Sequence, residues 1–327
     1  MLCSLQREGS PQLLHHNEKN GIQTPAEITD AAWKLRRPIL NMTSSEEITG
    51  TALPDLEHLA RTELGETAET KERCLSELRE LIKADSSLDW PTDEKFLVKF
   101  LRSRKYNVER AFKTIQKYFR VRQSSPELFE NLSPSNASYE TAVLDNHLVV
   151  TSKQRDPQGR AVVMVKLGAW NTDICPVTDL IRAVLIAAER ILMDEETQIR
   201  GAVGVYNLKG LSIYHLAHVT PFLLRKVAHL AQDCYPVRLK AVYVINHPPI
   251  CKVLFNALKP FLKSKLLQRF QFLGNDPRTF HGLLPPDCIP AEFGGTHEDF
   301  DYSGQHKDVL SKSDYFQYVN SFGFQRK

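Results

Sequence analysis

Apolar residues recur at every third or fourth position along the stretch from Leu53 to Gln123. Such spacing is typical of helices that bury one face. Its clearest run is Leu75, Leu78, Leu81 and Ile82. Thr92 and Asn107 each precede a further apolar run, so we expect them to cap the two helices that begin there. The pattern therefore predicts a small, entirely helical domain.

Beyond Pro126 the chain alternates short apolar runs with helical periods. The strand-like runs cover residues 148–150, 161–165, 202–206, 241–245 and 270–273. A turn-forming DPQG sequence separates the first two runs and predicts an antiparallel hairpin. The helical periods cover residues 179–193, 220–231, 249–258 and 260–267, with Thr220 and Pro221 suited to begin the second. Because strands alternate with helices, we expect an α/β fold with a largely parallel sheet.

These patterns divide the chain into four parts. Residues 1–50 are rich in polar residues and proline without a sustained period, and we interpret them as a flexible extension. Residues 51–125 form the helical domain, residues 126–300 the α/β domain, and residues 301–327 a C-terminal tail.

Charge is segregated along the chain, although 42 Lys and Arg nearly balance 39 Asp and Glu. Residues 95–125 hold ten basic side chains and one acidic one, and residues 234–275 hold seven basic side chains and no acidic one. This distribution favours a basic face that meets an anionic partner. The alternative is a set of ordinary solvated helix faces.

Composition places the chain among cytosolic globular proteins. Hydrophobic residues make up 42% of it, but no apolar run approaches the roughly 20 residues that cross a bilayer. The charged first residues do not resemble a secretory signal. The six cysteines lie far apart, and we interpret them as reduced thiols.

Motifs of the common enzyme classes are missing from the sequence. It contains no G-x-G-x-x-G, no G-x-x-x-x-G-K-[ST] and no G-x-S-x-G. His215, His218 and His229 lack the acidic ligand of a zinc site, so we expect surface side chains and no metal. Cys234 and Cys251 could be nucleophiles, but buried structural thiols are commoner. We expect no cofactor and no catalysis.

Nucleic-acid binding would need aromatic rings among the basic residues. Phe261, Phe270 and Phe272 are available, yet core packing explains them as well. We expect no nucleic-acid partner.

The segment from Pro248 to Phe272 combines apolar and cationic residues on two short helices, which Pro260 separates. Its apolar stripe is Leu254, Phe255, Leu258, Phe261, Leu262 and Leu266. Its charges are Lys252, Lys259, Lys263, Lys265 and Arg269. The surface of an anionic bilayer favours this combination. An ordinary helix pair packed on the sheet is the alternative.

Six ordered sequence stretches resemble the CRAL-TRIO family of lipid-transfer proteins, and within it the tocopherol transfer protein, cellular retinaldehyde-binding protein and clavesin group. They are FLVKFLRSRKY (96–106), DPQGR (156–160), YPVR (235–238), NHP (246–248), KPFL (259–262) and IPAEFGGT (289–296). The stretches are specific as a set, and the resemblance covers roughly residues 53–300.

The resemblance implies a helical CRAL-TRIO N-terminal domain before a lipid-binding domain, in which a mostly parallel sheet floors an apolar pocket and a mobile helix closes it. By position the gate is Pro249 to Leu258, including Val253, Leu254, Phe255 and Leu258, with Phe255 and Val253 facing the ligand. The pocket wall is implied to be Ile181, Val184, Leu185, Ala188, Ala202, Val219, Val227 and Leu230. Without the resemblance these residues would be interpreted as core.

The resemblance also implies a basic groove beside the gate for a phosphoinositide headgroup. The matching positions are Arg104, Arg238, Lys240, Lys265 and Arg269. Arginine forks bind phosphate oxygens through two hydrogen bonds, and Arg238 and Lys240, two apart on a strand, point to one face.

Two positions depart from the family pattern. Val184 and Ala188 stand where the tocopherol transfer protein has seryl hydroxyls, which makes tocopherol a doubtful cargo. Asn207 stands where the family usually has aspartate, and we expect this change to affect a structural hydrogen bond.

The sequence thus predicts a carrier for one small hydrophobic ligand, such as a tocopherol-, retinoid- or other lipid-like molecule. We expect it in the cytoplasm, associated peripherally with endosomal or other intracellular membranes through phosphatidylinositol phosphates on an anionic surface. One alternative is a clavesin-type phosphoinositide-binding trafficking adaptor with little cargo transfer. Another is a small-molecule enzyme that uses the α/β cleft, for which no convergent polar constellation is found.

Overall fold

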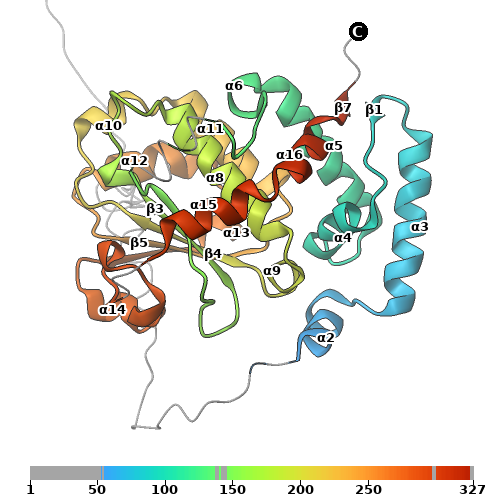
Figure 1. The fold of residues 1–327 in the computed structure, drawn as a ribbon, viewed down its shortest axis with the longest axis horizontal. Coiled ribbons are helices and arrows are strands. Elements are labelled where there is room, and N and C mark those ends of the chain that lie inside the picture. Colours follow the sequence, from blue (N-terminus) through green and yellow to red (C-terminus); the bar gives the residue numbers. More distant parts are fainter. Residues whose placement is uncertain (1–52, 54, 137–139, 141–145, 297–299, 325–327) are drawn as a thin grey trace, which may run out of the picture. The chain divides into compact units, whose positions relative to one another are not determined.

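A five-stranded sheet of order β2-β3-β4-β5-β6 organises the described part of the chain (Figure 1). The computed structural model describes residues 53, 55–136, 140, 146–296 and 300–324. The predicted extension over residues 1–50 lies outside these residues. Among them, no helix combines the length and the apolar character that crossing a bilayer requires.

The sheet has one antiparallel edge and is otherwise parallel. Its strands are β2 Val149–Thr151, β3 Ala161–Lys166, β4 Ala202–Asn207, β5 Leu239–Ile245 and β6 Phe270–Gly274. Strand β2 runs antiparallel to β3, and the β3–β4, β4–β5 and β5–β6 pairs are parallel. The predicted hairpin and the largely parallel sheet are both confirmed.

Helices connect these strands, and one further helix, α14 Pro277–His281, follows the last of them. The connecting helices are α8 Val177–Leu192, α9 Glu195–Arg200, α10 Ile213–Ala217, α11 Pro221–His229, α12 Cys251–Leu258 and α13 Ser264–Leu267. Five short helical turns accompany them: η3 Leu167–Ala169, η4 Leu230–Cys234, η5 Lys259–Phe261, η6 Pro286–Cys288 and η7 Ala291–Phe293. Thr220 caps α11 by accepting a hydrogen bond from the Leu223 amide, and Pro221 is the first helical residue, as predicted.

The two faces of the sheet are packed differently. On one face, side chains such as Val203, Val205 and Tyr243 are buried against Phe280 and Phe293 of the C-terminal segment. Alternate residues point to the opposite face, where Tyr206, Val242 and Val244 belong to a cluster with α12 side chains. This second face holds the candidate site.

The helical part of the chain precedes the sheet. Its elements are α2 Leu56–Leu59, η1 Ala60–Leu64, α3 Ala68–Ala84, α4 Glu94–Ser103, α5 Val108–Ser124 and α6 Pro126–Phe129. Asn107 caps α5, as predicted, but Asp93 and not Thr92 caps α4, because its carboxylate accepts a hydrogen bond from the Phe96 amide. Of the predicted α3 stripe, only Leu81 is exposed.

Residues 301–324 are folded. They form α15 Tyr302–Leu310, α16 Ser313–Asn320 and the strand β7 Gly323–Phe324. Strand β7 pairs antiparallel with β1 Leu88–Asp89 of the helical part, and Phe316 and Val319 are buried. The segment that the sequence suggested was only a tail therefore belongs to the core.

A buried ionic network ties the helical part to the sheet part. The Glu189 carboxylate of α8 accepts hydrogen bonds from Tyr118 of α5 at 2.5 Å and from Tyr315 of α16 at 2.9 Å. Lys99 of α4 lies 3.5 Å from the same carboxylate. Burial tends to raise the pKa of Glu189, but Lys99 and Arg122 outweigh it and lower the pKa. These partners keep the buried carboxylate ionised.

Candidate functional site

An apolar row of incompletely buried side chains lies on the helix-covered face of the sheet. Val163, Tyr206, Phe270 and Phe272 are half-buried, whereas their neighbours on the opposite face, such as Val203 and Val205, are fully buried. Large apolar side chains in a close-packed interior normally leave no accessible surface.

Helix α8 shows the same contrast around its axis. Ile181, Val184 and Ala188 recur at helical spacing and are half-buried, while Ala183, Ile186 and Ala187 are buried. The half-buried stripe therefore lies on one side of the helix. Of the other predicted wall residues, Val219 and Val227 are half-buried, and Leu185, Ala202 and Leu230 are buried. Their contact with a ligand stays a prediction.

Tyr206 lies in the middle of this row, in contact with the clusters of both α8 and α12. Burial raises the pKa of its hydroxyl, although the side chain is partly accessible. Within the described residues the hydroxyl has no hydrogen-bond partner. A polar group that is desolvated, partly accessible and unpaired can bind the polar end of a ligand.

The predicted gate is helix α12, and its two ligand-facing candidates lie on different sides. Phe255 packs onto the sheet, with ring centroids 4.8 Å from Phe272 and 5.4 Å from Phe270. Val253 is 56% exposed, so the expectation that it faces the ligand is wrong. The reason is geometric, because residues two apart on a helix point to nearly opposite sides. Leu254 and Leu258 are half-buried.

An exposed apolar surface beside the gate was missed by the sequence analysis. Helices α11 and α12 are in contact (Figure 1). Phe222 of α11 is more than half exposed, as Val253 is. Ile213 and Tyr214 of α10, which precedes α11 in the chain, are also more than half exposed. The signal in the sequence was three large apolar residues at helix starts, outside the periods that build the core.

Arg238 and Lys240 meet at a carboxylate from the helical part of the chain. Arg238 donates to Glu63 of η1 at 2.6 Å, and Lys240 donates to the same oxygen at 2.9 Å. Partial burial tends to raise the pKa of Glu63, but these hydrogen bonds outweigh it and lower the pKa. Burial lowers the pKa of Lys240, and Glu63 offsets this only in part.

Arg269 adds a third cation to this place. Burial lowers its pKa, and the like charge of Arg238 lowers it further. We call Arg238, Lys240 and Arg269 the basic cluster. Two cations share the Glu63 carboxylate, and Arg269 interacts electrostatically with one of them, Arg238, so the basic cluster is suited to a multivalent anion.

The other two predicted phosphate ligands stand apart from Glu63. Arg104 donates to the Thr114 hydroxyl at 2.7 Å, and burial lowers its pKa while Asp233 opposes that effect. Lys265 is exposed on α13, one turn before Arg269. Neither forms an ion pair with a described residue.

Gly201 is required for the shape of the basic cluster. Its φ of 94° is strained for any residue with a side chain, and a Cβ there would lie 2.4 Å from the Arg238 carbonyl oxygen. The Lys240 side chain would also be only 2.9 Å away. Glycine thus lets the stem of Lys240 lie against the backbone.

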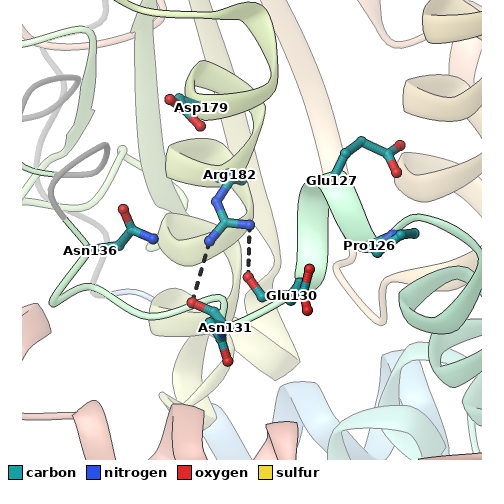
Figure 2. Close-up of a pocket in the computed structure, with 7 residues that line it drawn as sticks. All are labelled: Pro126, Glu127, Glu130, Asn131, Asn136, Asp179 and Arg182. Atoms are coloured by element: carbon teal, nitrogen blue, oxygen red, sulfur yellow. Dashed lines mark hydrogen bonds between the residues drawn. The ribbon is translucent and has the colours of Figure 1, made fainter.

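A separate polar recess of about 330 Å³ lies between α6 and α8 (Figure 2). Its lining residues are Pro126, Glu127, Glu130, Asn131, Asn136, Asp179 and Arg182. Figure 2 shows the Arg182 guanidinium pointing to the loop after α6, where it donates to the carbonyls of Glu130 and Asn131. Its carboxylates make it unsuitable for an anionic lipid headgroup, and Arg182 acts there as a structural tie.

Several other candidate groups have structural surroundings. Burial raises the pKa of Cys234 to about 12 and of Cys251 to about 11, so both thiols stay protonated at neutral pH. Ser212 caps α10, and its backbone N–H donates to the His215 ring at 3.0 Å. Asn207 accepts hydrogen bonds from the Lys209 amide and the Asn246 side chain, which makes it a structural residue, as expected. The described residues contain no cluster of metal-binding side chains.

Two family models match the chain. Residues 145–295 match the model described as CRAL/TRIO domain. Residues 67–139 match the model described as Pinta-like, UBA domain. The two matches cover the sheet part and most of the helical part.

Curated relatives match most of the chain. Alpha-tocopherol transfer protein-like from Homo sapiens is 36% identical over 263 residues, which are 80% of this chain and 76% of that protein. Clavesin-1 from Xenopus laevis is 31% identical over 258 residues, which are 79% of this chain and 77% of that protein. The crystal structure of Sfh5 superposes with a TM-score of 0.53 at 14% identity, over 78% of this chain and 97% of that one. That superposition supports the fold alone.

Proposed function

The chain belongs to the CRAL-TRIO family of lipid-transfer proteins, and we propose that it carries one small hydrophobic lipid and exchanges it at phosphoinositide-containing membranes. The lipid lies between the sheet and helices α8, α11 and α12. The basic cluster receives the phosphoinositide headgroup. Helix α12 opens when the protein meets the membrane.

The half-buried apolar row on one face of the sheet is the observation that carries this proposal. Tyr206, Val184 and Ala188 are inside the fold, yet each retains accessible surface. A lipid that covers such surface contributes roughly 25 cal/mol per Å², so some hundreds of Å² give useful affinity before entropic losses.

We infer that the cargo does not need a hydroxyl partner on α8. Val184 and Ala188 offer none, and Tyr206, which packs against the same core cluster, carries a hydroxyl. We propose a mostly apolar lipid with one hydrogen-bonding group, which Tyr206 binds.

Membrane contact combines apolar and electrostatic parts. Phe222 and Val253 lie exposed on the neighbouring helices α11 and α12. Through η5 and α13 the chain leads from α12 directly to Arg269. Apolar side chains then enter the bilayer surface while the basic cluster binds phosphates, and each cation contributes roughly 1 kcal/mol near an anionic membrane. Peripheral association with endosomal or other intracellular membranes follows.

The double substitution Arg238→Glu with Lys240→Glu tests this function. We expect it to abolish sedimentation with vesicles that contain phosphatidylinositol bisphosphate and to leave the bound lipid in place. Arg73→Glu with Lys83→Glu on α3 is the matched control, because it makes the same change in charge at two exposed side chains. Unchanged sedimentation of the first variant would remove the basic cluster from the proposal.

A trafficking adaptor of clavesin type is the second candidate. The basic cluster and the 31% identity to Clavesin-1 favour it equally well. It differs from a carrier in that it needs no stoichiometric lipid.

A further inference from the structure

Glu63 lies where a phosphate is expected to bind. One of its carboxylate oxygens accepts hydrogen bonds from both Arg238 and Lys240. Lys240 lies in β5 and Arg238 directly precedes that strand, whereas Glu63 comes from η1, 175 residues earlier than Arg238. The carboxylate satisfies the donors that a phosphate oxygen would otherwise use.

The backbone around this contact is fixed. Ala60 and Leu64 of η1 are buried at 4% and 3% exposure, and Gly65 ends the turn in the left-handed conformation. The Arg238 guanidinium also donates a hydrogen bond to the Ile199 carbonyl, which fixes the position of this side chain. The Glu63 side chain itself remains 38% exposed, so it can rotate to solvent while η1 stays in place.

We propose that Glu63 is a built-in competitor for the phosphate site, so that an arriving phosphate must exchange with its carboxylate. This inference rests on the proposed function of the basic cluster. A phosphate monoester carries close to two charges and three acceptor oxygens, whereas the carboxylate carries one charge. Multivalent phosphates therefore bind tightly enough to remain bound against this competition, and singly charged headgroups do not.

Competition of this kind lowers the affinity for every anion by the same factor. Two partly exposed ion pairs are together worth about 1 kcal/mol, which corresponds to roughly fivefold in affinity. This fivefold loss makes the affinity for weak ligands such as phosphatidylserine too low to be useful, while the affinity for phosphoinositides remains sufficient. Glu63 thereby sets the threshold of membrane recognition.

The substitution Glu63→Gln tests the inference, with Glu57→Gln as the matched control. Glu57 lies on the adjoining turn of the same segment and pairs with Arg61. Each substitution removes one negative charge, so the two variants have the same net charge. Binding is measured to phosphatidylcholine vesicles that contain either phosphatidylinositol bisphosphate or phosphatidylserine, and to soluble inositol trisphosphate. Glu63→Ala repeats the test without the amide, and thermal melting checks that each variant is folded.

We expect Glu63→Gln and Glu63→Ala to bind bisphosphate vesicles about fivefold more tightly than the unchanged chain and to acquire binding to phosphatidylserine vesicles. Glu57→Gln should change neither. A gain for inositol trisphosphate as well would show that the headgroup phosphates suffice for binding, and a gain on vesicles alone would show that binding also needs the membrane surface.

Equal binding of the Glu63 and Glu57 variants would overturn the inference and leave the proposed function standing, provided the unchanged chain still prefers bisphosphate vesicles. If the unchanged chain shows no such preference, the proposed function fails, and the competitor role of Glu63 fails with it.

Discussion

Ala183 and Ala188 lie on the same helix, yet only Ala183 is fully buried. Ala183 has no accessible surface, as expected for a side chain in a filled core. Ala188 is half-buried although it faces into the fold with Val184. The difference is what an unfilled space next to one side of α8 would produce.

Replacing Ala188 with phenylalanine should therefore fill space without much strain. We expect Ala188→Phe to keep its unfolding free energy within about 1 kcal/mol of the unchanged chain, and to lose the bound lipid. Chemical denaturation measures the first quantity, and lipid extraction the second.

Ala183→Phe is the control for this change. It inserts the same side chain into a packed place and should cost about 1–3 kcal/mol or more. If both variants were equally destabilised, the surface around Ala188 would be ordinary packed core, and the pocket would have no support from α8.

Single residues also show where sequence reasoning stops. Thr92 and Asp93 are neighbours that can both cap a helix, and only the backbone geometry selects Asp93. Arg238 and Lys240 followed from the family resemblance, with which their spacing of two agrees, but Glu63 did not, because its contact joins residues 175 positions apart in the chain. Local sequence patterns can identify a functional side chain, but they do not predict which distant residue it contacts.

Helices α10, α11 and α12 each carry large apolar side chains that the fold leaves exposed. Phe222 is 70% exposed, and the Lys226 ammonium lies 4.8 Å from its ring centroid. A phenylalanine with a lysine beside it suits the boundary between lipid tails and headgroups.

Phe222→Glu should weaken sedimentation with phosphoinositide vesicles at least tenfold, since full burial of such a side chain contributes about 1.5–3 kcal/mol. Stability should hardly change, because the side chain is exposed. Leu81→Glu on α3 is the control, as Leu81 is exposed on the helical part of the chain. Equal loss in both variants would mean that added negative charge alone weakens binding, and α11 would not touch the membrane.

Most helices and strands followed from periodicity, and the reasons for the exceptions are physical. The hairpin, the parallel strands and the cap of α11 all depend on short-range patterns. Residues after 300 lack a long apolar period, so the sequence suggested a tail. Helix α16 nevertheless buries Phe316 and Val319, because β7 pairs with β1 more than 200 residues earlier.

The molecule as proposed combines a fixed frame with a mobile cover. The network around Glu189 ties the helical part to the sheet, because breaking a buried ion pair costs about 3–5 kcal/mol. Helix α12 has one fully buried residue, Cys251, among its eight. Elements with few buried contacts open most easily. The frame therefore keeps the basic cluster in place while α12 moves.

Native mass spectrometry of the purified chain tests the presence of cargo most directly. A carrier predicts a dominant species heavier than the polypeptide by the mass of one small lipid, and loss of that extra mass after incubation with phosphoinositide vesicles. If only the mass of the polypeptide is detected, whichever lipid-containing preparation the chain comes from, the carrier function is contradicted. The adaptor function then remains.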